Sequence, residues 1–223
     1  KGKEVNMGKD QETVERKSQR FKQLCIGILA QSGNCQASQH DFGETTSIRE
    51  MCDAWHKYWH GMITEVPQQV VQAFHDFYPD FKTEINAAGI FYNEDSRTGY
   101  VLVGDSDEPI HLFFAHTAYI LGKAQVVLHG SASALAMTTG CKVELLDNSR
   151  ATIKEGYAIA RNNSYLVTSK EAECYDCATV HITDGTLHDH GHREICAYGE
   201  ATIHSFTSRL IKLYDKSKLS IKK

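Results

Sequence analysis

Five consecutive residues, His188-Asp189-His190-Gly191-His192, form the densest group of potential metal ligands in the sequence. Imidazole and carboxylate groups are the usual protein ligands of zinc and related metals. In an extended strand alternate residues point to the same side, so His188 and His190 would share one face at a spacing that can chelate. We therefore consider a weak zinc site formed by His188, His190 and His204. The alternative is a solvated face that carries several histidines.

The cysteines indicate a reduced, cytoplasmic protein. Seven cysteines are an odd number, in a chain too long to need disulfide bonds for its stability. Cys174 and Cys177 form a C-x-x-C pair, but a zinc knuckle needs a second pair of ligands. Strand alternation separates the two thiols, so we expect them to be structural.

Motifs of the common catalytic sites are absent from the sequence. The chain has no G-x-S-x-G nucleophile elbow and no glycine-rich pattern that cradles phosphate. Its short repeats also leave little length for the loops that line the clefts of carbohydrate-cleaving helices. The sequence therefore does not favour an enzyme, and it assigns no catalytic residue and no cofactor besides the zinc considered above.

The aromatic cluster at residues 55–60 has two interpretations. Trp55 and Trp59 are four residues apart, so in a helix they lie on one face. That face either belongs to the core, which we favour, or forms an aromatic interface for a partner. His56 and His60 have the spacing of metal ligands on a helix but lack the acidic residue of a zincin-type motif.

The first third of the chain is predicted to be helical. Apolar side chains in residues 14–29 recur at helical spacing along a helix predicted for residues 10–31. Their heptad-like period suits homo-oligomerisation through this helix. Residues 36–44 are polar, which predicts a linker.

Capping signals place the next helices. Ser47 and Glu50 fit the capping box of a second helix, and Pro67 suits the first turn of a third. Pro79 is expected to stop the third helix. A short fourth helix would then begin at Asp80 and end before Gly89.

From about residue 116 the chain repeats an eight-residue unit. Each unit has a small residue, two apolar residues two positions apart, and a Gly or Asp. The clearest copies begin at Ala124, Ala178, Ala201 and Arg209. Strand alternation places the two apolar side chains on one face, and the Gly or Asp allows a tight corner.

Such units bury their apolar faces only when coils stack in parallel. Steps of this length fit either two or three strands per turn, that is about 16 or about 24 residues. Small residues at inward positions indicate a narrow interior and favour two strands; these are Ala118, Ala132, Ala172, Ala178 and Ala201. The main alternative is an antiparallel sandwich or barrel, which usually has longer and less uniform strands.

The predicted fold is α+β, with an N-terminal helical domain followed by a single-stranded parallel β-solenoid (β-helix). We assign residues 1–89 to a helical cap or oligomerisation domain, residues 110–219 to the solenoid and residues 220–223 to a basic tail. Residues 90–109 form either a hairpin or the first coil beneath the helices.

The number of strands per turn decides which outward side chains lie together. With two strands, Glu173, His188 and His204 stack along one face about 4.8 Å apart. With three strands, His181 lies over His204 instead. Either row would bind zinc weakly or respond to pH. The candidate interface residues are Trp55, Trp59, His181, His188 and Glu173.

The octad pattern of residues 110–219 resembles the short-repeat β-solenoid proteins as a structural class. Members of that class act as adaptors, adhesins, filament formers, ice binders and, with longer coils, carbohydrate enzymes. The resemblance implies a fold but not an activity.

The charge is unevenly distributed along the chain. The net charge is −4, but residues 105–208 hold 13 acids against seven bases, and residues 209–223 hold six bases against one acid. An acidic body makes nucleic acid an unfavourable partner, and no apolar run is long enough to span a membrane. We therefore expect a homo-oligomeric module that binds another protein through an acidic solenoid face.

Two other functions stay open. An acidic mimic of nucleic acid would hold its carboxylates on one face, and the residues to test are Glu144, Glu155, Glu173, Asp184 and Glu200. A metal-dependent, carbohydrate-active enzyme would instead use the three histidines of the proposed zinc site.

Overall fold

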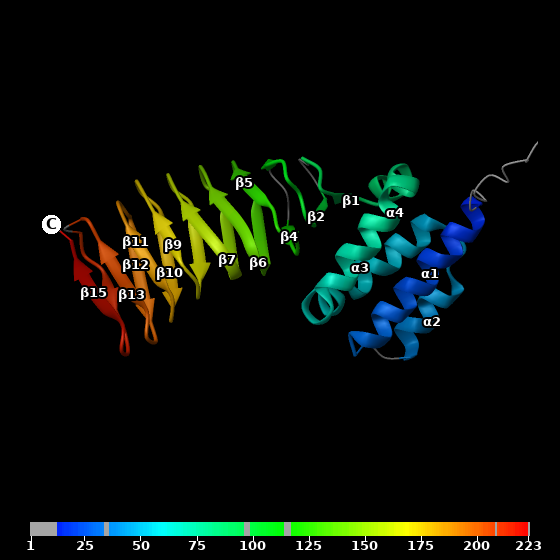
Figure 1. The fold of residues 1–223 in the computed structure, drawn as a ribbon, viewed down its shortest axis with the longest axis horizontal. Coiled ribbons are helices and arrows are strands. Elements are labelled where there is room, and N and C mark those ends of the chain that lie inside the picture. The colour runs from blue at the N-terminus through cyan, green and yellow to red at the C-terminus, as the bar shows by residue number, and fades with distance from the viewer. Residues whose placement is uncertain (1–12, 34–35, 96–98, 114–116, 208, 223) are drawn as a thin grey trace, which may run out of the picture.

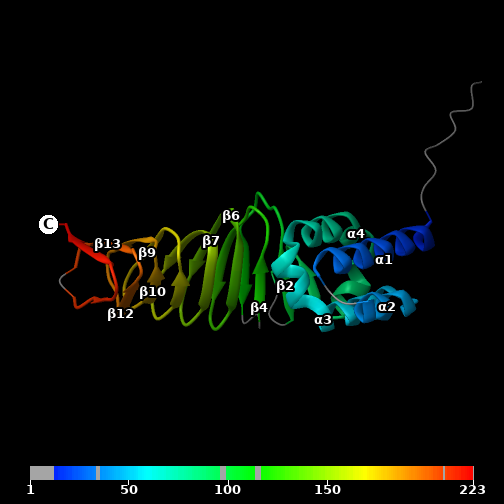
Figure 2. The ribbon, with the colours of Figure 1, turned by 90° about the horizontal axis from the view of Figure 1, so that it is seen from below.

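The computed structural model describes the chain except for residues 1–12, 34–35, 96–98, 114–116, 208 and 223. Helices at the N-terminal end are followed by a parallel β-solenoid of about seven turns, as Figure 1 shows. The turned view in Figure 2 shows the coils continuing away from the helices, so that the last coil lies at the far end of the molecule. The predicted fold is confirmed.

Four helices precede the solenoid in the described residues: α1 (Val14–Gln31), α2 (Gln36–Glu44), α3 (Ile48–Glu65) and α4 (Pro67–Ala87). The apolar stripe of α1 lies in the core of this bundle, where Phe21, Cys25 and Leu29 are fully buried. Only Val14, at the start of the helix, is largely exposed. The stripe serves packing within the chain, which removes the reason for expecting self-association through this helix.

Residues 36–44 form helix α2, so the prediction of a linker is wrong. Phe42 is fully buried, and its ring meets that of Trp55 with 6.5 Å between the centroids. A segment with one large apolar side chain gives only a weak helical pattern. Packing of Phe42 against α3 supplies the stability that the local pattern lacks.

The starts of α3 and α4 follow the sequence signals. The Ser47 hydroxyl accepts a hydrogen bond of 3.2 Å from the Glu50 N–H, and the Glu50 carboxylate accepts one of 3.2 Å from the Ser47 N–H. The predicted capping box is therefore confirmed. Pro67 occupies the first turn of α4, where a missing N–H costs nothing.

Helix α4 kinks where the sequence predicts a stop. The kink is at Phe81, two residues after Pro79, where φ is −123° and ψ is 23°. Pro79 lacks an N–H and crowds the preceding turn, which explains the distortion. The helix continues to Ala87 because Phe81 and Ile85 remain buried in the bundle. The predicted fourth helix is thus the last part of α4.

Trp55 and Trp59 lie in the core of the helical bundle, with exposed fractions of 0% and 4%. The Trp55 Nε1–H donates to Cys25 Sγ, 3.2 Å away, and the two indole rings meet at 5.7 Å between centroids. The core interpretation is confirmed, and neither side chain is accessible to a partner.

The solenoid has two strands per turn, one on each of two faces. Face A contains β1 (Ile90–Tyr92), β2 (Tyr100–Val103), β4 (Thr117–Ile120), the first parts of β6 (Ser133–Leu145) and β7 (Arg150–Ala160), β8 (Tyr165–Thr168), β10 (Thr179–Thr183), β12 (Glu194–Tyr198) and β14 (Lys212–Leu213). Face B contains β3 (Ile110–Phe113), β5 (Gln125–His129), the second parts of β6 and β7, β9 (Ala172–Cys174), β11 (Thr186–Asp189), β13 (Thr202–Ser205) and β15 (Lys218–Ile221).

All strand pairs of the described residues are parallel, and each joins neighbouring coils. Thr186 lies opposite Thr202, for example, and Thr202 lies opposite Lys218. Two strands per turn are confirmed, whereas the three-stranded coil and the antiparallel sandwich are wrong. The inward alanines are also confirmed, since Ala118, Ala132, Ala172, Ala178 and Ala201 are fully buried.

The first coil joins the solenoid to the helices. Strand β1 pairs in parallel with β2, with Ile90 opposite Tyr100, so the two strands belong to successive coils and the hairpin alternative is wrong. Tyr92, Leu102 and Leu121 are buried in the same apolar core as the helical side chains. The helical bundle therefore covers the first coils.

Polar residues at the corners hold neighbouring coils together. Gly130, Asp147 and Asp184 have φ values of 58°, 56° and 59°, a left-handed conformation that Gly and Asp tolerate. Asp147 Oδ2 accepts a hydrogen bond of 2.9 Å from the Gly130 N–H in the preceding coil. Asp184 Oδ1 accepts one of 2.7 Å from the Glu200 N–H in the next coil. Part of the acidic charge of the solenoid therefore stabilises its corners.

Candidate binding surface

Glu173, His188 and His204 form an outward row on face B. His188 lies opposite Glu173 on one side and opposite His204 on the other. The imidazole rings of His188 and His204 stack with 5.3 Å between centroids. The predicted two-strand row is confirmed. His181 lies on face A between Val167 and Cys196, away from this row.

The three histidines of the predicted zinc site do not converge. His188 and His204 belong to the row, but His190 lies beyond the end of β11, where its ring stacks between those of Tyr175 and Phe206. Alternation continues past the end of β11, since Asp189 is buried and His190 is exposed on the same side as His188. The rings of His188 and His190 nevertheless belong to two different stacks. Within the described residues no three His, Cys, Asp or Glu side chains are arranged to hold a metal ion.

The carboxylate of Glu173 is occupied by two tyrosines. Its two oxygens accept hydrogen bonds of 2.5 Å from the hydroxyls of Tyr157 and Tyr175. These hydrogen bonds, with that of Tyr157 the stronger influence, hold the pKa of Glu173 below its usual value. The hydrogen bond to Glu173 raises the pKa of Tyr175 in turn. Glu173 is therefore a fixed anion that orients the neighbouring rings.

A second row of rings runs along the corner beside face B. Tyr175, His190 and Phe206 stack with centroid separations of 4.7 Å, and their planes are within 8° of parallel. Arg161 covers the Tyr175 ring at 4.3 Å, and Lys222 lies over the Phe206 ring at 5.8 Å. We call these five residues the corner row.

The sequence analysis did not predict the corner row, although the sequence contains a signal for it. Its members directly precede the corner in every second octad, as Tyr175 precedes Asp176 and His190 precedes Gly191. Recognising the row requires the register between coils, which brings residues about 16 apart into contact.

A buried polar network underlies the corner row. The Asp189 side chain points into the solenoid and is fully buried, together with Ser205 and Cys174. Its carboxylate accepts hydrogen bonds from Ser205 Oγ at 2.5 Å and from Thr207 Oγ1 at 3.0 Å. His192 Nδ1 lies 2.9 Å from the same carboxylate. Ser205 bonds to the aspartate and not to the histidine, so this group is not a hydrolytic triad.

Burial raises the pKa of Asp189, but the hydrogen bonds from Ser205 and His192 outweigh it and leave that pKa below its usual value. Burial also raises the pKa of Cys174, which therefore stays a thiol. Cys177 is exposed beyond the corner, so the two cysteines are separated as predicted. No disulfide joins the cysteines of the described residues, and Cys35 lies outside them.

Most of the exposed large apolar side chains in the described residues lie at the C-terminal end of the solenoid. Eight large apolar side chains in the described residues are exposed, and six of them lie between residues 206 and 221: Phe206, Leu210, Leu213, Tyr214, Leu219 and Ile221. Phe206 is also the outermost ring of the corner row. The last coil and the corner row therefore form one continuous surface.

The carboxylates proposed for a nucleic-acid mimic do not share a face. Glu144 and Glu173 lie on face B, whereas Asp184 and Glu200 lie at corners. Glu144 is paired with Arg161 at 2.8 Å and Glu200 with Lys216 at 3.4 Å. Glu155, on the long strand β7, is paired with Lys170 at 3.0 Å.

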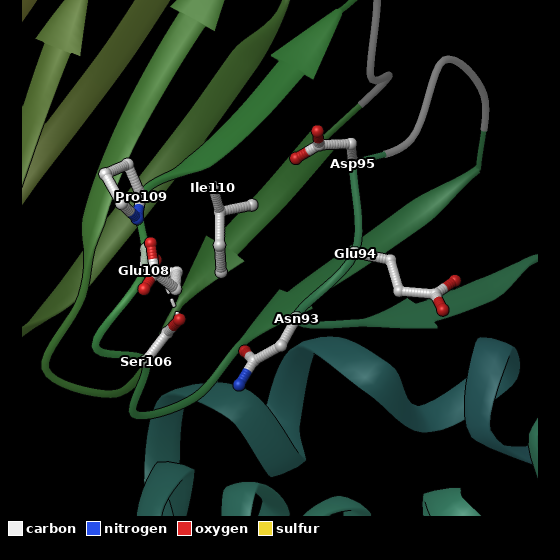
Figure 3. A pocket seen from close by; sticks show the side chains of 7 residues that line it. All are labelled: Asn93, Glu94, Asp95, Ser106, Glu108, Pro109 and Ile110. Atoms are coloured by element: carbon white, nitrogen blue, oxygen red, sulfur yellow. Dashed lines mark hydrogen bonds between the residues drawn. The ribbon is translucent and has the colours of Figure 1, made fainter.

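An open depression of about 520 Å³ lies where the first coil meets the helices. Figure 3 shows that the carboxylates of Glu94 and Asp95 on its wall point away from each other. Glu94 is paired with Lys82, and Asp95 accepts a hydrogen bond of 2.7 Å from the His111 N–H. Both of these carboxylates therefore already have partners, and they do not converge on a common ligand position.

None of the helices in the described part of the chain is long and apolar enough to cross a membrane. No model of a known protein family matches the chain, and no similar chain was found among curated proteins or solved structures.

Proposed function

We propose that the protein is a protein-binding module whose last coil receives an extended, acidic segment of another protein. The observation that carries this proposal is the gathering of six exposed large apolar side chains in residues 206–221. Apolar surface concentrated at one place is typical of an interaction site, whereas apolar residues scattered singly are not.

The strands of the last coil suit the addition of a further strand. Among the described residues β14 pairs only with β12, and β15 pairs only with β13. The N–H and C=O groups on the other edges can therefore bond to an extended segment. Leu219 and Ile221 of β15 are 39% and 63% exposed and offer apolar contacts to alternate side chains of such a segment.

The charge of the last coil favours an acidic partner. Residues 209–223 hold six bases and one acid. Lys212 and Lys216 pair with glutamates of the preceding coil, but no carboxylate of the described residues forms an ion pair with Lys218 or Lys222. Two copies of this basic end would repel each other, so a second copy is the poorer occupant.

The alternatives have less support. A metal-dependent enzyme would need His188, His190 and His204 to converge, and His190 instead stacks between Tyr175 and Phe206. A nucleic-acid mimic would need unpaired carboxylates on one face, and Glu144 and Glu200 are both in ion pairs.

The proposal is tested by fluorescence anisotropy with a labelled peptide of alternating Glu and Val, about eight residues long to exceed the length of one strand. We expect this peptide to bind, to be displaced by salt, and to bind more tightly than a peptide of alternating Lys and Val. Lys218→Glu and Ile221→Glu should each weaken binding about tenfold or more. Val14→Glu, which alters an exposed apolar residue at the other end, is the matched control.

Equal binding of the two peptides, or equal losses in Ile221→Glu and Val14→Glu, would contradict the proposal. So would a concentration-dependent dimer in analytical ultracentrifugation that Ile221→Glu abolishes, because it would assign this edge to a second copy.

A further inference from the structure

Another open depression, of about 320 Å³, lies at the corner where strands β7, β8, β10 and β12 of face A begin. Its lining residues are all polar or basic, and none of them is an acid: Asn148, Arg150, Asn163, Tyr165, Thr179 and Arg193. Guanidinium, amide and hydroxyl groups all supply hydrogen-bond donors. We call this place the arginine depression.

Parallel pairing brings the strand residues of the arginine depression together from successive coils. Arg150 lies opposite Tyr165, and Tyr165 lies opposite Thr179. Arg193 comes from the coil after that, where its N–H donates to the Ala178 carbonyl oxygen at 2.8 Å. Three coil steps separate the backbones of the two arginines by about 14 Å, so their long side chains extend into the same depression from its two ends.

The corners add two amides to the arginine depression. Asp147 and Asn162 have φ values of 56° and 55°, and each is followed by an asparagine that lines the depression, Asn148 and Asn163. The Asn163 N–H donates to the Asp147 carbonyl oxygen at 2.9 Å, which fixes the two corners to each other. Neither asparagine side chain has a hydrogen-bond partner among the described residues, so both amides can bind a ligand.

The two arginines carry positive charge that the protein does not compensate locally. No carboxylate in the described part of the chain forms an ion pair with Arg150 or Arg193. Glu194, which directly follows Arg193, pairs with Lys212 instead. Two guanidinium groups that line one depression without an acid therefore favour an anionic ligand.

A neighbouring depression of about 280 Å³ offers apolar contacts. It shares Arg150 and Tyr165 with the arginine depression, and its lining includes the half-buried Leu135 and the buried Ala134 and Ala151, with Thr and Ser residues beside them. Because the two depressions share two lining residues, one small molecule can place an anionic group in the first and an apolar group in the second.

We propose that the arginine depression binds the phosphate group of a small phosphate monoester, whose apolar part lies in the neighbouring depression against Leu135. A phosphate monoester carries about 1.5 to 2 negative charges at neutral pH and three acceptor oxygens. Two guanidinium groups donate paired hydrogen bonds to such a group from two sides. A carboxylate has one charge and two oxygens, so it would leave part of these donors unused. This site lies on face A and goes beyond the peptide binding proposed for the last coil.

The test is an NMR titration of the full chain labelled with nitrogen-15, in which phenyl phosphate is added at pH 7.5. We expect the shifts of backbone amide signals to concentrate at residues 148–150, 163–165 and 179. Arg150→Gln and Arg193→Gln should each weaken binding about tenfold or more, because each removes charge-assisted hydrogen bonds. Lys142→Gln, which removes an exposed cation from face B, is the matched control and should bind as the wild type does.

Two comparison probes separate the parts of the proposal. Inorganic phosphate should shift the same signals but bind about threefold or more weakly than phenyl phosphate, because it leaves the neighbouring depression empty. Leu135→Ser should remove this difference. Phenylacetate, which keeps the ring but carries a carboxylate, should bind about tenfold or more weakly than phenyl phosphate.

The proposal would be overturned by the absence of shifts at these residues in about 10 mM phenyl phosphate. Equal losses of affinity in Arg150→Gln and Lys142→Gln would overturn it as well, since they would show attraction by net charge alone. Equal affinity for phenyl phosphate and phenylacetate would exclude a phosphate site, and equal affinity for phenyl phosphate and inorganic phosphate would exclude the ester. None of the probes is a peptide, so these failures are distinct from failure of the peptide-binding test.

Discussion

Replacing Gly122 with Ala tests how closely the coils stack. A Cβ atom at this position would lie 2.1 Å from the carbonyl carbon of Gly104 and 2.2 Å from the backbone nitrogen of Asp105, both in the preceding coil. Non-bonded heavy atoms of this kind separate to about 3.5 Å, so the two coils would have to move apart by roughly 1.4 Å. The clash is with backbone, which cannot rotate away as a flexible side chain does.

The cost follows from what that movement breaks. The Gly122 N–H donates to the Val103 carbonyl at 3.0 Å, and the Ser106 N–H donates to the Lys123 carbonyl at 3.0 Å. Overpacking costs about 1–3 kcal/mol, and each lost hydrogen bond costs about 1 kcal/mol. We therefore expect Gly122→Ala to lower the free energy of unfolding by about 3 kcal/mol or more.

The assay is urea unfolding followed by tryptophan fluorescence, which reports on Trp55 and Trp59 in the core that the first coils share with the helices. The control is Gly27→Ala in α1, where no atom lies within 4 Å of the added Cβ. This control should gain about 1 kcal/mol from helix propensity. A Gly122→Ala protein within about 0.5 kcal/mol of the wild type would refute the stacking of residues 104 and 122.

Three further predictions concern the interior, the anionic row and the thiols. Ile203→Ala, in the solenoid core, should lower the free energy of unfolding by about 2–5 kcal/mol, whereas Leu210→Ala, 84% exposed, should change it by less than about 0.5 kcal/mol in the same assay. The pKa of Glu173 is lowered in the folded state, so its contribution to stability is present above the pKa of the unfolded chain and is lost as the pH falls below about 4. Urea titrations at several pH values should therefore show a smaller loss of stability between pH 5 and pH 2 in Glu173→Gln than in the wild type. Equal losses in the two proteins would contradict the conclusion that Glu173 is an anion held by the two tyrosine hydroxyls. In the native protein, iodoacetamide should label the exposed Cys177 and leave the buried Cys174 unmodified until the protein unfolds. Mass spectrometry of the labelled protein measures this order, and the reverse order would contradict the position of the corner between the two cysteines.

Much of the solenoid could be predicted because its physical signal is simple. Alternating inward residues and corner residues at steps of about eight define a coil, and small inward alanines define its width. With two strands per turn, the same spacing predicts that Glu173, His188 and His204 lie in one row. Strand pairing fixes Cα positions, and outward side chains at matched positions must then be neighbours.

The remaining features depend on contacts that local patterns do not encode. Helix α2 forms because Phe42 is buried against Trp55, and the sequence of residues 36–44 alone does not predict this contact. The stacking of His190 between Tyr175 and Phe206 depends on the register between coils, because these residues are about 16 positions apart in the sequence. The buried network of Asp189 and His192 places polar groups in an apolar interior, where the octad pattern predicts none.

The stacking of coils is tested most directly by pyrene excimer fluorescence. Cysteines replace His188 and His204 in a protein where Cys35 and Cys177 are serine, and pyrene maleimide labels the pair. Because the two positions lie opposite each other on neighbouring parallel strands, the pair should give strong excimer emission, and the pair at His181 and His204, on opposite faces, should give none. Excimer emission from the second pair and not from the first would contradict a solenoid with two strands per turn.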